Sequence, residues 1–257
     1  MLKRAIKYLL HLLPNDLLYR KIQVYLSQRA VKQGAMEDSM RPVLEQLIPA
    51  GATALDVGAN FGHYTAFLAQ QVGKDGQVYA FEPIPTAFKI AQAVTRSYPQ
   101  VQLYQKGVGV SEEIVAFHLP IDDWKNKSFG LAHLETKKVR EEARTIAIKA
   151  SIVAIDDFLL PQLMRLDFVK IDTEGSEFFV LKGMQKTIER FQPIIYVELV
   201  SDFLARYDVR TLDVYQFIRA IDYSLYCYRD ECFLPFEGEH FSDNFLLCPK
   251  SMQLPNI

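Results

Sequence analysis

Three acidic side chains follow an apolar run in the second half of the chain. The run covers residues 166–171, and Asp172, Glu174 and Glu177 come shortly after it. This pattern predicts a buried strand followed by a helix. Ligands of open α/β sheets bind beyond the carboxyl ends of strands, so we expect Asp172 in an active site. Glu177 more simply complements the dipole at the helix start, and Glu174 stays open between the two roles.

A second strand-to-helix joint lies at residues 54–69, where Gly58 and Gly62 flank a tight turn. Glycine allows a ligand to approach the backbone closely, and an asparagine such as Asn60 tolerates left-handed backbone. A dinucleotide fingerprint would need glycines at positions 60 and 63, and His63 occupies the second of them. The turn therefore disfavours NAD or FAD, and the lysine of a phosphate-binding Walker loop is absent.

Two further carboxylates indicate which ligand the turn binds. Asp56 lies near the end of the first strand, where it would attract an ammonium and repel a pyrophosphate. Glu82 ends the next strand, and a carboxylate there can accept both hydroxyls of a ribose. S-adenosylmethionine carries an ammonium and a ribose diol but no phosphate. We therefore expect this cofactor, held by Asp56, the turn between Gly58 and Gly62, and Glu82.

Apolar runs and amphipathic segments alternate from residue 53 onward, which predicts parallel strands connected by helices. The expected strands cover 53–57, 77–82, 101–105, 166–171, 193–199, 223–228 and 244–248. The expected helices cover 63–73, 85–97, 152–161, 176–190 and 211–221. Residues 118–150 interrupt the alternation and are expected to form an insertion or lid.

Four motifs in order carry a family resemblance: LDVGANFGHYT, FEP, VKIDTEGSEFFVLKG and PIIYVEL. Together they resemble the FkbM family of S-adenosylmethionine-dependent methyltransferases over residues 37–248. The resemblance implies a Rossmann-like class I methyltransferase fold, an α/β architecture whose seven-stranded, mostly parallel sheet has an antiparallel last strand. It also implies cofactor contacts at Asp56, Gly58, Asn60, Gly62 and Glu82 and places Val108 beside the adenine pocket.

Methyl transfer from a sulfonium leaves a neutral thioether, so catalysis depends mainly on holding the acceptor close and aligned. An alcohol acceptor also needs a base or a metal. We expect Asp172 and Glu198 to be catalytic and the acceptor to be a hydroxyl of a small molecule, sugar or lipid-linked natural product. Mg²⁺ on Asp172, Glu198 and either Asp243 or Asn244 is conceivable but not favoured. Alternatives are aminopropyl transfer and a non-catalytic, cofactor-binding scaffold.

The composition separates the N-terminal segment from the main body. Residues 1–35 carry seven Lys or Arg and one acidic residue, whereas the whole chain has a net charge of −2. We expect an N-terminal helical extension over 1–35, with amphipathic helices near 2–12 and 16–31, and a methyltransferase domain over 36–257. The basic helices predict peripheral membrane contact through residues 1–31, and the acidic body disfavours nucleic acid.

The cysteine content and the hydropathy indicate a cytoplasmic protein. Three cysteines are too few for a disulfide framework, and no apolar run approaches the ~20 residues of a membrane-spanning helix. A peripheral location at the membrane, through the basic helices, stays open.

Overall fold

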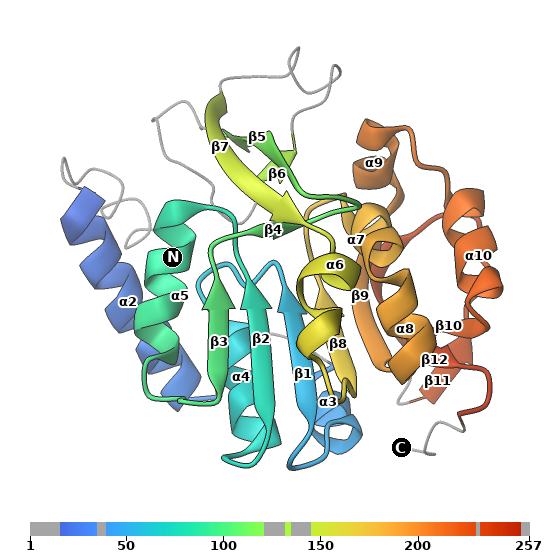
Figure 1. The fold of residues 1–257 in the computed structure, drawn as a ribbon, viewed down its shortest axis with the longest axis horizontal. Coiled ribbons are helices and arrows are strands. Elements are labelled where there is room, and N and C mark those ends of the chain that lie inside the picture. The colour runs from blue at the N-terminus through green and yellow to red at the C-terminus, as the bar shows by residue number, and fades with distance from the viewer. Residues whose placement is uncertain (1–15, 35–39, 121–131, 135–144, 230–231, 253–257) are drawn as a thin grey trace.

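The computed structural model describes residues 16–34, 40–120, 132–134, 145–229 and 232–252. One large sheet is covered by helices on both faces, and a smaller sheet lies beyond the carboxyl ends of its parallel strands (Figure 1). The large sheet has the strand order β11-β10-β12-β9-β8-β1-β2-β3. Its strands are β1 (Thr53–Val57), β2 (Gln77–Phe81), β3 (Val101–Tyr104), β8 (Phe168–Ile171), β9 (Ile194–Val200), β10 (Tyr223–Arg229), β11 (Cys232–Pro235) and β12 (Ser242–Pro249).

The strand directions confirm the class I methyltransferase arrangement. Strands β3, β2, β1, β8 and β9 run parallel, and β12 inserts antiparallel between β9 and β10. Seven strands therefore match the expected sheet. An eighth strand, β11, extends it by pairing antiparallel with β10 across a hairpin. This addition covers the edge that β10 would otherwise expose.

The two faces of the large sheet hold different helices. On one face pack α3 (Arg41–Leu47) and α4 (His63–Val72). On the other pack α7 (Glu177–Gly183), α8 (Gln185–Phe191) and α10 (Thr211–Ala220). Side chains of a strand alternate between faces, so within β1 Leu55 and Val57 face α7 while Ala54 faces α4. The same alternation turns Asp56 toward α4.

Two expected helices differ from those observed. The segment 176–190 is divided into α7 and α8 at Met184. A Cβ on the preceding Gly183 would lie 1.8 Å from the carbonyl oxygen of Gly109, so this close approach requires glycine at the helix end. The segment 152–161 yields only the short α6 (Ile155–Phe158) and a 3₁₀ turn, since a strand runs to Val153.

The smaller sheet was not expected from the sequence. Its order is β4-β7-β5-β6, with β4 (Gly107–Val108), β5 (Glu113–Pro120), β6 (His133–Leu134) and β7 (Thr145–Val153). The predicted insertion at 118–150 begins within β5 and ends within β7. Much of β5 and β7 is exposed or half-buried, in contrast to a fully buried parallel strand of the large sheet such as β8. The lid function of this segment stays a prediction.

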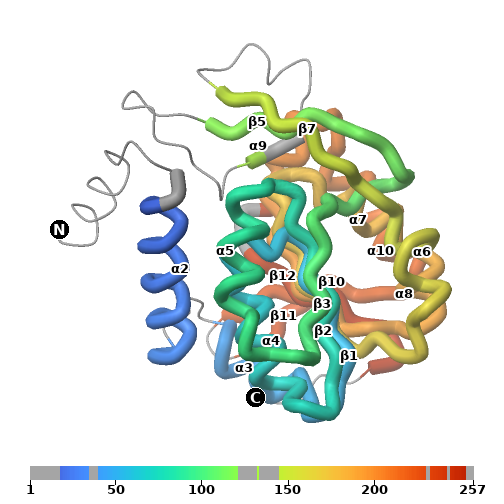
Figure 2. The backbone as a smooth tube through the Cα atoms, turned by 60° about the vertical axis from the view of Figure 1, so that its left-hand side comes forward, coloured from blue at the N-terminus to red at the C-terminus, as the bar shows by residue number. Residues whose placement is uncertain are grey.

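The N-terminal part of the described chain is a helix, α2 (Asp16–Lys32), which lies beside α5 (Pro85–Thr95) (Figure 2). Its inner side packs through Tyr19, Val24 and Val31. The expected helix at 2–12 lies outside the described residues, and contact of this region with a membrane stays a prediction. Within the described ranges, no helix is long and apolar enough to cross a bilayer.

Candidate functional site

Strand alternation and register bring a buried lysine between two aspartates. Asp56 on β1 and Lys170 on β8 are direct cross-strand partners, so both side chains point toward α4. Lys170 Nζ lies 3.9 Å from Asp56 Oδ1 and donates a 3.0 Å hydrogen bond to Asp172 Oδ2. The ring of Tyr64 stands 4.8 Å from the same ammonium. A charge that is only 4% exposed is thus held by carboxylates and an aromatic face.

These surroundings keep the lysine charged. Burial by itself lowers the pKa of Lys170, but the charges of Asp172 and then Asp56 outweigh that effect and raise the pKa above its ordinary value. Asp56 is itself completely buried and accepts a 2.6 Å hydrogen bond from the Thr65 hydroxyl on α4. Asp56 therefore holds Lys170 by an ion pair and α4 by the hydrogen bond from Thr65.

The first glycine of the turn lies against the end of β8. Gly58 has a φ of +86°, and a Cβ there would lie 1.8 Å from the backbone oxygen of Asp172. The Asp172 backbone N–H in turn donates to Val57. Only glycine allows the turn and the acidic joint to approach this closely, so two segments more than a hundred residues apart in the sequence form one surface.

The predicted ribose ligand, Glu82, is held by the same turn. Its Oε2 accepts a hydrogen bond from the backbone of Asn60, which has a φ of +48°, and its Oε1 accepts one from the backbone of Ile84. Each oxygen keeps a lone pair for a further donor. Burial raises the pKa of Glu82 to about 7, although the two backbone hydrogen bonds oppose this rise.

A cavity of about 260 Å³ opens over these residues, close to the lower end of the ~300–1,000 Å³ typical of small-molecule sites. Of the sequence-predicted residues, it is lined by Gly58, Asn60, Glu82, Val108 and Asp172. Asp56, Gly62 and Glu198 do not line it. Gly62, with a φ of +80°, instead begins α4 and packs on Ala91. The smaller sheet contributes Phe117 to the cavity wall, and Ala132, which precedes β6, contributes as well.

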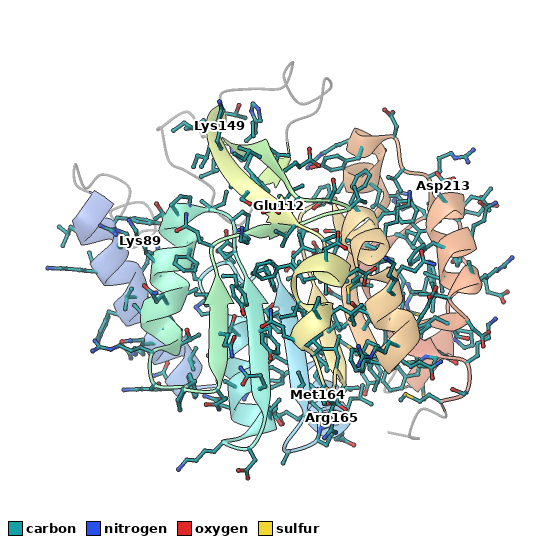
Figure 3. All side chains as sticks on the ribbon, viewed as in Figure 1. Lys89, Glu112, Lys149, Met164, Arg165 and Asp213 are labelled. Carbon is teal, nitrogen blue, oxygen red and sulfur yellow. The ribbon has the colours of Figure 1, made fainter. Side chains whose placement is uncertain are left out.

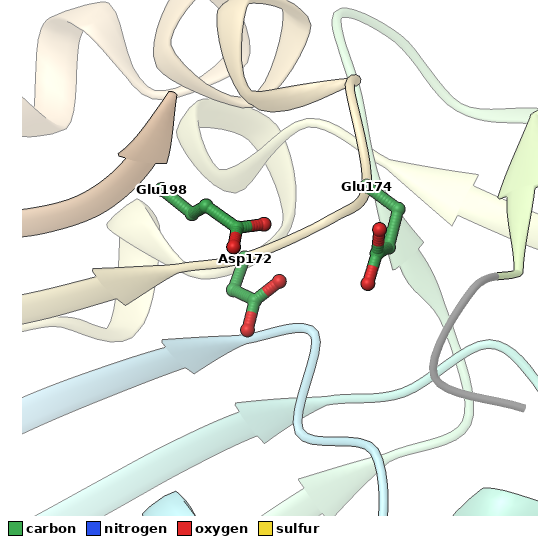
Figure 4. A group of neighbouring side chains, drawn as sticks. All are labelled: Asp172, Glu174 and Glu198. Atoms are coloured by element: carbon green, nitrogen blue, oxygen red, sulfur yellow. The ribbon is translucent and has the colours of Figure 1, made fainter. Parts of the chain in front are cut away.

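Three carboxylates gather at one side of the cavity: Asp172 and Glu174, which follow β8, and Glu198, which lies near the end of β9 (Figure 4). Ile171 pairs with Val197, so the next residues along the two strands, Asp172 and Glu198, are neighbours on the same face. One oxygen from each of the three lies within 4.8 Å of the others, close enough to share a cation. Glu174 thus takes the place that the sequence interpretation gave to Asp243 or Asn244, and the side chain of Asp243 lies outside the described residues.

The crowding changes how two of these acids titrate. Burial and then the charge of Asp172 raise the pKa of Glu198 to about 7 and that of Glu174 to about 8. A hydrogen bond with Asp172 contributes to the rise at Glu198. Glu198 therefore changes its protonation near neutral pH, where a general base works best.

The interpretation of Glu177 as a helix-start residue is confirmed. Its Oε1 accepts hydrogen bonds from the backbone N–H groups of Thr173 and Gly175 and from the Thr173 hydroxyl. The side chain is almost fully buried and begins α7. Glu177 thus shapes the loop that carries Glu174 instead of lining the cavity.

Sequence reasoning missed Lys170 and Phe117 on the cavity wall. Lys170 had a detectable signal: it is a charged residue inside an apolar parallel strand, two positions before Asp172 and hence on the same face. Phe117 had none, because its strand belongs to the unexpected smaller sheet. No histidine that lines the cavity other than His63 was found within the described part of the chain.

Comparisons with known proteins identify related methyltransferases. Residues 56–225, more than half of the chain, match the methyltransferase FkbM domain. "Methyltransferase 1" of Beauveria bassiana is 28% identical over 152 residues, which cover 53% of this chain and 59% of that protein. "Methyltransferase sdnD" of Sordaria araneosa is 23% identical over 163 residues, covering 54% of this chain and 62% of that protein. The chain therefore spans less than two thirds of these relatives.

Among solved structures, the crystal structure of methyltransferase FkbM from Methylobacillus flagellatus KT aligns with 91% of this chain and 60% of its own. The sequence identity is 17% and the TM-score is 0.49.

Proposed function

Because the chain belongs to the methyltransferase FkbM domain family, we propose that it transfers a methyl group from S-adenosylmethionine to a hydroxyl group. The acceptor is a small molecule, a sugar or a lipid-linked natural product. The observation that carries this proposal is one cavity with a ribose-type carboxylate, Glu82, on its wall and the Asp172, Glu174 and Glu198 carboxylates at one side.

The residues present fit the cofactor. Glu82 has lone pairs for the ribose hydroxyls, and the buried Asn60 Oδ1 has no hydrogen-bond partner among the described residues. Val108 offers an apolar surface for the adenine. When bound, S-adenosylmethionine supplies an electrophilic methyl group on a sulfonium. Glu82, Asn60 and Val108 then orient the nucleoside end.

Cofactor affinity is expected to depend on pH through Glu82. Ribose hydroxyls donate to the charged carboxylate, whose pKa is about 7, so binding requires loss of its proton. Affinity should rise with pH up to about 7 and fall by roughly tenfold for each pH unit below it. Calorimetric titration of wild type between pH 5.5 and 8 measures this dependence. Glu82→Gln, which cannot ionise, should bind weakly with a flatter profile, whereas equal pH profiles would contradict the ribose assignment.

Glu198 is the proposed general base. Asp172 already accepts a hydrogen bond from Lys170, which leaves it less available to a second donor. Glu198 lacks such a cation within hydrogen-bond distance in the described structure and has a pKa of about 7. It can therefore accept the proton of an acceptor hydroxyl at neutral pH, while Asp172 stays paired with Lys170.

Turnover is expected to continue after exhaustive removal of metals. Lys170 already supplies a cation to Asp172, and a neutral thioether leaving group needs no Lewis acid. Assays before and after EDTA treatment followed by gel filtration in metal-free buffer check this expectation. A loss of activity that Mg²⁺ restores would show instead that the carboxylates Asp172, Glu174 and Glu198 hold a metal.

Label transfer tests the function itself. Incubation with S-adenosylmethionine labelled in the methyl group and a panel of hydroxylated sugars and lipid-linked glycans should label one acceptor. The product should resist mild base, as an ether does and a carboxyl ester does not. Decarboxylated S-adenosylmethionine with polyamines tests aminopropyl transfer, for which we expect no product. Cofactor binding without transfer to any acceptor of these classes would favour the scaffold alternative.

A further inference from the structure

We propose that the Lys170–Asp172 ion pair binds the amino-acid end of S-adenosylmethionine, with Lys170 facing the carboxylate and Asp172 facing the ammonium. This inference rests on the proposed function, because it presumes that the cofactor occupies the cavity. It adds a specificity-determining residue, Lys170, and it replaces Asp56 as the ammonium ligand expected from the sequence.

The side chain of Lys170 lies between the core and the cavity. The residue is 4% exposed, yet it lines the cavity together with Asp172. Among the described residues its ammonium donates to Asp172 Oδ2 at 3.0 Å and reaches the Gly58 carbonyl oxygen at 3.5 Å. An ammonium has three donors, so one is left for a ligand. The 3.9 Å separation from Asp56 Oδ1 is an ion-pair distance and too long for a hydrogen bond.

Asp56 cannot itself contact the ligand. Its side chain is completely buried beneath Lys170 and does not line the cavity. One of its oxygens is occupied by the Thr65 hydroxyl. The carboxylate that the cavity does expose is that of Asp172, whose side chain is 38% accessible. The role of ammonium ligand therefore passes from Asp56 to Asp172.

Charge complementarity identifies the part of the cofactor that this pair suits. An amino acid is a zwitterion, and a fixed ammonium beside a fixed carboxylate matches it group for group without adding net charge to a buried site. The nucleoside is assigned to Glu82 and Val108, which leaves the Lys170–Asp172 pair for the other end of the molecule.

The same pair discriminates between the two transfer reactions. Decarboxylated S-adenosylmethionine, the aminopropyl donor, has an ammonium at this end but no carboxylate. Lys170 would then have no partner in the ligand and would repel the ammonium. A lysine in this position therefore favours the methyl donor over the aminopropyl donor.

Two ligands that differ only at the amino-acid end test the inference by binding. S-adenosylhomocysteine carries the amino acid, 5′-methylthioadenosine lacks it, and neither carries a sulfonium. Isothermal titration of both into the full-length wild-type protein, Lys170→Met and Lys170→Arg gives the contribution of the lysine. Lys89→Met, on an exposed position of α5, is the matched control for loss of a lysine (Figure 3). Glu82→Gln is the control for the nucleoside end.

In Lys170→Met, affinity for S-adenosylhomocysteine should fall by about 10- to 100-fold, the range for a hydrogen bond to a charged group. Affinity for 5′-methylthioadenosine should change by less than about threefold, which also shows that the variant is folded. Lys170→Arg should keep part of the lost affinity, Lys89→Met should match wild type, and Glu82→Gln should weaken both ligands.

Equal losses for both ligands in Lys170→Met, or no loss for either, would overturn the inference while leaving the cofactor assignment standing. Failure of wild type to bind either ligand would overturn the proposed function and the inference with it. The two failures are therefore distinguishable.

Discussion

Replacement of Glu198 by glutamine is expected to reduce the rate of methyl transfer by roughly 10²–10⁴-fold, the contribution typical of a general base. Glutamine keeps the size of the side chain and its hydrogen-bonding capacity, but it cannot accept a proton. Glu198 does not line the cavity that the cofactor would occupy, so cofactor affinity should stay within about threefold of wild type. The effect should therefore appear in kcat and not in the binding constant.

The pH profile separates this chemical role from a structural one. With a pKa of about 7 at Glu198, the wild-type rate should rise with pH through neutrality and level off above it. Glu198→Gln should lose that rise. Glu189→Gln, a matched change at an exposed position of α8, should behave as wild type. A Glu198→Gln enzyme with more than about one tenth of the wild-type rate would rule out Glu198 as the base.

Replacement of Asp172 by asparagine should abolish methyl transfer almost completely while the fold stays intact. The change removes the charged partner of Lys170 on the cavity wall and leaves the buried ammonium with Asp56 alone. Asparagine is nearly isosteric, and Gly58 approaches the backbone at this position instead of the side chain, so the joint between the turn and β8 should persist.

Steady-state kinetics and thermal unfolding together check the Asp172→Asn prediction. The KM for the cofactor should rise along with the loss of kcat, because the same carboxylate faces the amino-acid end of the cofactor. Asp75→Asn, an exposed change in the loop before β2, is the control and should leave both constants unchanged. Near wild-type kinetics in Asp172→Asn would contradict its assignment, and a collapse of the unfolding transition would show a structural role instead.

Buried strands, whose residues are mainly apolar, were predictable from the sequence. Strand β1 was expected at 53–57 and is observed there, since it is a mainly apolar segment between Gly51 and Gly58 with Asp56 as its one charged residue. The smaller sheet was not predictable, because β5 and β7 are largely exposed and are paired across more than twenty residues of sequence. The pairing of two exposed strands so far apart in the sequence cannot be inferred from the residues of either strand alone.

At the site, too, residues that follow a clear strand were predictable, whereas contacts between distant segments were not. Glu82 and Gly58 could be assigned from position alone, because each follows a clear strand. The burial of Asp56 could not, since it depends on the register of β1 with β8, which places Lys170 and not solvent beside its carboxylate. Likewise, the convergence of Glu198 with Asp172 and Glu174 arises from neighbouring strand ends that sequence spacing does not specify.

A crystal structure of the protein with S-adenosylhomocysteine is the most direct test of the claim that this cavity is the cofactor site. We predict that the ribose hydroxyls contact the Glu82 carboxylate and that the amino-acid end contacts Lys170 and Asp172. The ligand bound in the opposite orientation, bound away from the turn at Gly58, or absent at saturating concentration would contradict the account.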